Sequence, residues 1–241
     1  MNMIKAFFID IDNTLLDFDA YVVETMQQGF QKFSLRQFEP WMADVFHVEN
    51  NKLWRALEDG RLTFEELQRI RWNTIFEKLG IESDGIMFEA YFRNQLRESA
   101  IPVAGACELL DGLKKSGAIL CVASNGPYEQ QMNRLRLAGM TDYFDYFFIS
   151  EDIGFSKPAE EFFRESFRRL NGNRSAEEAI CPEECVMLGD SLTSDMAGGR
   201  SCGMHTVYFS RGKKCPEAVD AFPVWDEWYE SLSAVSHAYG K

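Results

Sequence analysis

Short apolar runs alternate with amphipathic stretches along most of this chain. The apolar runs are too short for helices and rich in β-branched and aromatic residues, which is typical of strands buried inside a parallel sheet. The stretches between them repeat apolar residues every three or four positions, as amphipathic helices do. The predicted strands are residues 4–9, 118–123, 146–149, 185–188 and 205–209. The predicted helices that alternate with them are residues 106–116, 128–138, 160–170 and 195–201. This alternation predicts an α/β fold with a parallel sheet covered on both faces.

The stretch between the first strand and residue 102 shows only helical patterns. Thr63 and Glu66 form a predicted capping box ahead of one of its helices. The predicted helices of this stretch are residues 20–33, 38–57, 67–79 and 86–96. Aromatic residues are dense here, and we interpret most as the core of a helical bundle, with a ligand pocket as the alternative for single rings.

The domain organisation follows from the first strand, which must join the sheet across this helical stretch. The helical stretch is therefore predicted to be an insertion and not a separate N-terminal domain. The expected division is a sheet core of residues 1–16 and 101–241 and a helical cap of residues 17–100. A last amphipathic helix is predicted over residues 225–235.

Composition narrows the classes of partner. The chain has 241 residues, of which 46% are hydrophobic and 26% charged, as in an ordinary globular protein. Its net charge of −13 disfavours binding to nucleic acid polymers and to anionic membranes. It does not exclude an anionic substrate, because a metal or local cations can override the global field. No run has the length of a membrane span, and no signal peptide is predicted, so we expect a cytoplasmic protein.

The cysteines indicate free thiols. Six are present, and without a secretory signal a reduced state is expected. The spacing of Cys181, Cys185 and His205 fits zinc-binding patterns poorly. Cys121 and Cys185 lie within apolar runs and are predicted to be small core residues.

Residues 7–16, with the sequence FFIDIDNTLL, carry the strongest chemical signal. The predicted strand ends in Asp10 and Asp12, and ligands of parallel sheets bind just beyond the carboxyl ends of strands. Two carboxylates there repel each other unless a cation or a proton separates them. The segment therefore indicates an acidic site for a hard metal ion, and a plain polar turn is the alternative.

Three later segments carry further reactive residue types. Ser124, Asn125 and Gly126 follow the second strand and could cradle an anion, although a simple turn explains them too. Lys157 precedes a proline that favours an extended backbone, whereas a lone lysine usually lies at the surface. The fourth predicted strand is followed by Gly189 and a segment with two acids, Asp190 and Asp195. Asp195 is placed where the N-terminus of a helix would stabilise a carboxylate.

Together these segments resemble the haloacid dehalogenase-like hydrolase superfamily, whose four motifs are all legible. They are Asp10 with Asp12, Ser124, Lys157, and Asp190 with Asp195. The resemblance implies a Rossmann-like parallel sheet core with an inserted α-helical cap of the first insertion type. It also implies phosphoryl transfer through an aspartyl-phosphate and a small phosphorylated metabolite as substrate.

The resemblance assigns the central chemistry to two acids and a metal. Asp10 is expected to be the nucleophile, and Asp12 the general acid that protonates the leaving oxygen and then the base that activates water. Mg²⁺ suits an all-oxygen site. Its expected protein ligands are the carboxylates of Asp10 and Asp190 and the backbone carbonyl of Asp12.

The remaining roles implied by the resemblance concern phosphate binding and support. Ser124 and backbone N–H groups near Asn125 and Gly126 are expected to hold phosphate oxygens. Lys157 is expected to neutralise Asp10 and the phosphate. Asp195 is expected to orient Lys157 or a water on the metal.

Three positions refine this expectation. Thr14 is expected to assist Asp12 or fix the turn. Gly189, which lacks a Cβ atom, is expected to let its loop approach the metal closely. Ser194 departs from the family pattern, in which many members carry Asn at this position. This departure bears on the hydrogen bonds that support the metal ligands.

Asp12 also separates reaction classes. Family members that cleave carbon–halogen bonds lack an acid here, so its presence favours phosphate esters. Residues 12–19 resemble the subgroup that hydrolyses nucleoside 5′-monophosphates, especially pyrimidine ones. The alternatives are a phosphomutase, a sugar-phosphate phosphatase and a non-catalytic binding protein. Four cap arginines could meet a substrate, but each is expected at the surface: Arg55, Arg61, Arg69 and Arg71.

Overall fold

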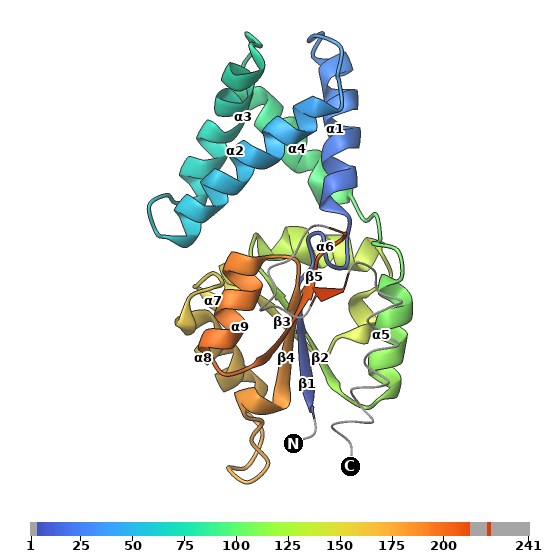
Figure 1. Ribbon diagram of the computed structural model, residues 1–241, viewed down its shortest axis with the longest axis vertical. Coiled ribbons are helices and arrows are strands. Elements are labelled where there is room, and N and C mark those ends of the chain that lie inside the picture. The colour runs from blue at the N-terminus through green and yellow to red at the C-terminus, as the bar shows by residue number, and fades with distance from the viewer. Residues whose placement is uncertain (1–3, 213–220, 223–241) are drawn as a thin grey trace. The chain divides into compact units, whose positions relative to one another are not determined.

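The computed structural model describes residues 4–212 and 221–222 (Figure 1). It separates into two compact units, one formed by the chain up to Asp17 and from Ala100 onward, the other by Phe18–Ser99. The helix predicted over 225–235 and Cys215 lie outside the described residues. Among the helices of the described ranges, none is both long and apolar enough to cross a membrane.

The first unit is built on one parallel sheet, as the sequence predicted. Its strand order is β3-β2-β1-β4-β5-β6, so the first strand lies inside the sheet, between strands that come much later in the chain. Within the described residues, each pair of neighbouring strands in this order is parallel. The strands are β1 Ala6–Ile9, β2 Ile119–Ser124, β3 Tyr146–Ile149, β4 Cys185–Gly189, β5 His205–Phe209 and β6 Ala221–Phe222.

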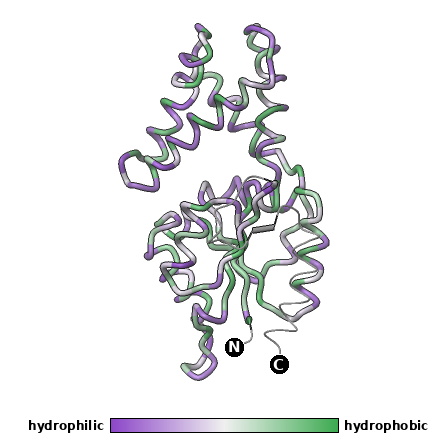
Figure 2. The backbone as a smooth tube through the Cα atoms, viewed as in Figure 1, coloured by the Kyte–Doolittle hydropathy of each residue, from purple (hydrophilic) through white to green (hydrophobic). Residues whose placement is uncertain are grey.

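Helices cover both faces of this sheet (Figure 1). They are α5 Ala106–Lys115, α6 Tyr128–Leu137, α7 Ser150–Ile153, α8 Glu160–Leu170 and α9 Ala197–Ser201, with 3₁₀ turns at Thr141–Tyr143 and Pro182–Glu184. Side chains of a strand alternate between faces. Accordingly Phe7 and Ile9 pack in the core cluster that contains α5, and Phe8 packs in the cluster that contains α8. Both faces are apolar, which explains the nearly continuous hydrophobic strands in Figure 2.

The second unit is a bundle of helices rich in aromatic residues. Its helices are α1 Phe18–Lys32, α2 Trp41–Glu58, α3 Phe64–Leu79 and α4 Gly85–Glu98. Rings that sequence patterns placed in a core are buried here, among them Trp72 and Phe88 with centroids 4.3 Å apart. The expectation that Arg71 lies at the surface is wrong: it is buried and pairs with the buried carboxylate of Glu89 at 2.6 Å.

The predicted element boundaries needed some correction. The helix predicted from residue 38 begins at Trp41, just after Pro40, which lacks the N–H that a helix interior requires. The short helix α7 was not predicted, because four residues are too few to show a period. The helix predicted over 195–201 is a π-helical turn, Leu192–Met196, followed by α9.

Candidate active site

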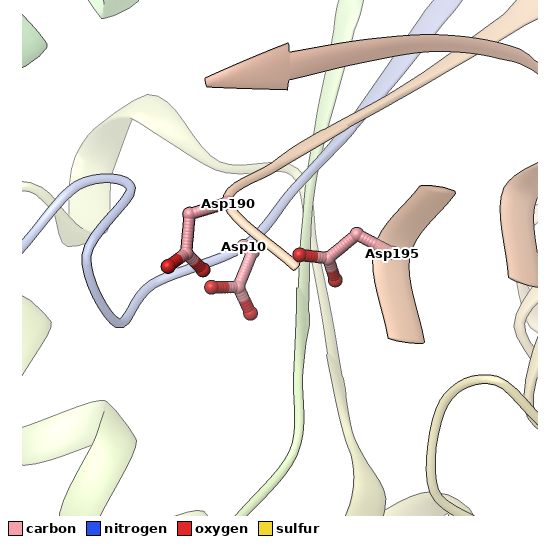
Figure 3. Close-up of side chains that lie close together, drawn as sticks. All are labelled: Asp10, Asp190 and Asp195. Carbon is pink, nitrogen blue, oxygen red and sulfur yellow. The ribbon is translucent and has the colours of Figure 1, made fainter. Parts of the chain in front are cut away.

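The acids that follow β1 and β4 meet at the carboxyl edge of the sheet. Ile9 of β1 pairs with Leu188 of β4, and the Asp10 N–H donates to the Leu188 carbonyl at 2.9 Å. This register brings together two acids that the chain separates widely. Carboxylate oxygens of Asp10, Asp190 and Asp195 lie within 4.8 Å of one another (Figure 3). Hard cations such as Mg²⁺ prefer oxygen donors, so this set fits the predicted metal.

Lys157 lies between two of these acids and is only 1% exposed. Its Nζ donates to Asp10 Oδ1 at 2.8 Å, to Asp195 Oδ1 at 2.6 Å and to the Ala123 carbonyl. Burial by itself lowers the pKa of Lys157, but the carboxylates of Asp10 and Asp195 outweigh burial, so its pKa lies above the ordinary value. Lys157 is therefore charged at neutral pH and offsets part of the negative charge of the cluster.

Asp10 is only 7% exposed. Burial raises the pKa of Asp10 to about 7, Lys157 opposes this rise, and the charges of Asp195 and Asp12 add to it. A nucleophilic carboxylate must be ionised to attack. The arrangement therefore needs further positive charge to keep Asp10 fully ionised near neutral pH, and a divalent cation would supply it.

Asp195 follows β4 near a helix N-terminus, in the first turn of the helical segment, as the sequence indicated. It lies inside the π-helical turn, and its Oδ2 accepts the Ser191 N–H at 3.0 Å while its Oδ1 pairs with Lys157. The cap of this turn is the hydroxyl of Ser191, which accepts the Ser194 N–H at 3.1 Å. Asp195 thus joins the N-terminal turn of this helical segment to Lys157.

Gly189 makes room for Asp195. A Cβ atom built on Gly189 would lie 2.1 Å from Asp195 Oδ2, far inside van der Waals contact. The absence of a Cβ atom at Gly189 therefore allows the close approach of the Asp195 carboxylate.

Replacing Gly189 by alanine is expected to lower the free energy of unfolding by about 1–3 kcal/mol, because the new methyl group displaces the Asp195 carboxylate. Urea unfolding followed by circular dichroism measures this loss. Gly172→Ala is the matched control, since its Cβ would meet nothing closer than 3.4 Å, and a change within about 0.5 kcal/mol is expected. Equal stabilities of the two variants would contradict the packing argument.

The loop after β2 positions Lys157 as well as a hydroxyl. Ser124 is buried at the end of β2. The side chain of Asn125 donates to the Lys157 carbonyl at 2.9 Å and accepts the Lys157 N–H at 2.8 Å, which fixes that backbone in two directions. The Gly126 N–H donates to Ser150 Oγ at 2.9 Å. Asn125 thus supports Lys157, a role that its sequence position did not indicate.

Asp12 lies in the tight loop that follows β1. Asn13 adopts a left-handed backbone, with φ of 59°, and its N–H donates to the Leu16 carbonyl at 2.7 Å. The Thr14 hydroxyl is buried and, within the described ranges, has no hydrogen-bond partner, so it makes no hydrogen bond to Asp12. Arg211, which follows β5, donates to the side chains of Asn13 and Asp17 and so connects this loop to the segment after β5.

Sequence reasoning missed two residues that contact Asp12. Gln131 and Arg134 of α6 are each 1% exposed, and both donate to the Asp12 carboxylate. Their spacing places both on one side of the helix. No motif marks them, and polar residues of an amphipathic helix are normally assigned to its solvent face.

Most of this chain is similar in sequence to known proteins. A family model described as haloacid dehalogenase-like hydrolase matches residues 4–203. YfnB of Bacillus subtilis, which is named a HAD-hydrolase, is 30% identical over 226 residues, covering 94% of this chain and 92% of YfnB. A crystal structure of YfnB bound to magnesium matches with a TM-score of 0.83 at 28% identity, covering 96% of this chain and 99% of that one.

Two other similar proteins carry the name pyrimidine 5′-nucleotidase. PynA of Streptococcus pneumoniae is 30% identical over 206 residues, covering 86% of this chain and 84% of PynA. YjjG of Escherichia coli is 30% identical over 223 residues, covering 90% of this chain and 91% of YjjG.

Proposed function

This chain belongs to the haloacid dehalogenase-like hydrolases, and we propose that it is a Mg²⁺-dependent phosphatase of small phosphate monoesters, preferring nucleoside 5′-monophosphates. The observation that carries the proposal is the pairing of a buried Asp10 with Lys157 beside a second acid, Asp12, on the same short loop. A nucleophile, a charge-neutralising cation and a proton donor are the groups that ester cleavage at phosphorus requires.

The metal of the proposed site would be held by the carboxylates of Asp10 and Asp190 and the backbone carbonyl of Asp12. When bound, Mg²⁺ supplies charge neutralisation and polarises the phosphate oxygens. The acid cluster and the raised pKa of Asp10 fit a site that holds a cation.

In the first step an oxygen of Asp10 attacks phosphorus while the bond to the ester oxygen breaks. Asp12 gives its proton to that departing oxygen, which leaves as an alcohol. The Ser124 hydroxyl binds a phosphate oxygen, and the Lys157 ammonium, held beside Asp10, stabilises the negative charge of the transition state through its own charge.

In the second step the Asp12 carboxylate takes a proton from water, whose oxygen attacks the aspartyl-phosphate. The bond between phosphorus and Asp10 breaks, so phosphate leaves and the Asp10 carboxylate is restored. Splitting one displacement into two lets the same pair of acids serve both halves of the reaction.

Two observations support the proposed preference for nucleotides, and neither concerns the groups at the edge of the sheet. Residues 12–19 resemble the nucleotidase subgroup, and two proteins of about 30% identity are named pyrimidine 5′-nucleotidases. In the proposed mechanism, the groups at the edge of the sheet contact and transfer only the phosphoryl group. Residues elsewhere in the chain must therefore set the substrate preference.

A substrate panel tests the proposal. Phosphate release is measured from nucleoside 5′-monophosphates, sugar phosphates and other phosphate monoesters, with Mg²⁺ or with EDTA. We expect release that EDTA abolishes and a kcat/KM for pyrimidine nucleotides at least about tenfold above that for sugar phosphates, a difference of about 1.4 kcal/mol.

Each other result assigns a different function. A higher kcat/KM for sugar phosphates would retain the phosphatase and overturn the nucleotide preference. Transfer of labelled phosphate between positions of one sugar, without free phosphate, would identify a phosphomutase. Binding of phosphate-like ligands without any turnover would indicate a binding protein.

A further inference from the structure

The side of Asp12 that faces α6 is occupied by two buried polar side chains. Arg134 Nη1 donates to Asp12 Oδ1 at 2.6 Å, and Gln131 Nε2 donates to Asp12 Oδ2 at 2.9 Å. Both carboxylate oxygens are therefore held, each by a different residue. Arg134 and Gln131 are almost fully buried, whereas the Asp12 side chain keeps 32% of its surface exposed.

The two side chains also contact each other, and Gln131 contacts the predicted phosphate-binding hydroxyl of Ser124. Arg134 Nη1 donates to Gln131 Oε1 at 2.9 Å, which orients the amide of Gln131. Its Nε2 then also donates to Ser124 Oγ at 2.9 Å. A hydroxyl that accepts a hydrogen bond retains its own hydrogen as a donor. The Ser124 hydroxyl itself donates only a long contact of 3.5 Å to the Asn125 carbonyl, so its hydrogen can turn to a phosphate oxygen.

We propose that Arg134 and Gln131 are positioning residues for proton transfer by Asp12, a role that rests on the proposed phosphatase function. Negative charge develops on the Asp12 carboxyl group as its proton passes to the leaving oxygen. A preorganised guanidinium against Oδ1 stabilises that charge at the moment it forms. Oδ2 is the oxygen that transfers the proton, since its partner Gln131 is neutral and lies beside Ser124, where the phosphate binds.

The burial of Arg134 argues for a role tied to Asp12. An arginine removed from water is costly unless an anion and hydrogen-bond acceptors compensate it. Arg134 forms an ion pair with Asp12, the acid whose position the chemistry requires. If Arg134 had only a structural role, its replacement would lower stability and would reduce kcat/KM by the same factor for every substrate.

The dependence of kcat/KM on the leaving group therefore distinguishes a role in proton transfer from a purely structural role. An alkoxide needs its proton as the bond breaks, whereas p-nitrophenolate leaves readily without one. The quantity measured is kcat/KM, which reports the steps up to departure of the leaving group. For Arg134→Met we expect a loss of about 100-fold on an alkyl phosphate such as a nucleoside 5′-monophosphate, and below about tenfold on p-nitrophenyl phosphate.

Three further variants sharpen the comparison. Arg134→Lys retains the charge and is expected to recover part of the alkyl phosphate activity. Gln131→Met removes the other contact to Asp12 and is expected to show the same dependence on the leaving group, which keeps the test valid if Arg134→Met does not fold. Arg136→Met is the matched control, because Arg136 is exposed on the same helix and pairs with Asn133.

The outcomes separate this inference from the proposed function. Equal losses on both substrates, or no loss, for folded Arg134→Met and Gln131→Met would overturn the positioning role. If Asp12→Asn shows the dependence on the leaving group and these variants do not, the phosphatase stands and only this inference fails. If the unmodified protein hydrolyses neither substrate, the proposed function itself fails.

Discussion

Replacing Asp10 by asparagine is expected to lower Mg²⁺-dependent phosphate release by roughly 10⁴-fold or more, the scale at which loss of a covalent nucleophile is felt. Asparagine has nearly the same shape, but its amide oxygen is a poor nucleophile and carries no charge. The buried position of Asp10, 2.8 Å from the Lys157 ammonium, leaves little room for another group to take over the attack. Release of phosphate from the best substrate of the panel measures the loss.

A control and a chemical marker complete this experiment. Asp142 is exposed in the turn after α6, so Asp142→Asn is expected to keep full activity. Rapid quenching of the unmodified protein during turnover should trap a phosphorylated peptide that contains residue 10, and Asp10→Asn should yield none. Phosphate release by Asp10→Asn at a rate close to that of the control would show that the nucleophile is another residue.

The edge of the sheet was the part of the site most open to prediction. Each acid follows an apolar strand directly, and in a parallel sheet all carboxyl ends meet at one edge. Correct prediction of β1 and β4 is therefore enough to place Asp10 and Asp190 at that edge. The glycine at position 189 was also visible, but the group that needs its space, the Asp195 carboxylate, could be identified only from coordinates.

The support around Asp12 could not be predicted, for a physical reason. Gln131 and Arg134 lie 119 and 122 residues from Asp12, and the contact depends on how far α6 is rotated against the sheet. A hydrophobic pattern defines which face of a helix is apolar, and it says little about a polar residue at the margin of that face. Arg71 was misjudged for the same reason, since only coordinates show the carboxylate of Glu89 that compensates its burial.

Replacing Lys157 by methionine is expected to lower the free energy of unfolding by about 3–5 kcal/mol at pH 8 with EDTA present, because two carboxylates remain buried without their cation. Phosphate release should also fall by roughly 10²–10³-fold, since a charge that stabilises the transition state is lost. Denaturant unfolding provides the first quantity and the steady-state assay the second. Lys114→Met is the matched control: Lys114 pairs with Asp145 at 2.9 Å with both side chains about 40% exposed, so a loss below about 1 kcal/mol is expected.

The pH dependence decides whether the buried carboxylates cause this loss. The pKa of Asp10 is raised on folding from 3.8 to about 7, so its ionisation opposes folding increasingly as the pH rises through this range. Lys157 works against that rise, and without it the pKa of Asp10 lies higher still. At pH 5 Asp10 is therefore protonated in both proteins, and the deficit of Lys157→Met must be smaller than at pH 8. A deficit that is the same at both pH values would mean that the methionine disturbs packing and that Lys157 is not the cation that compensates Asp10.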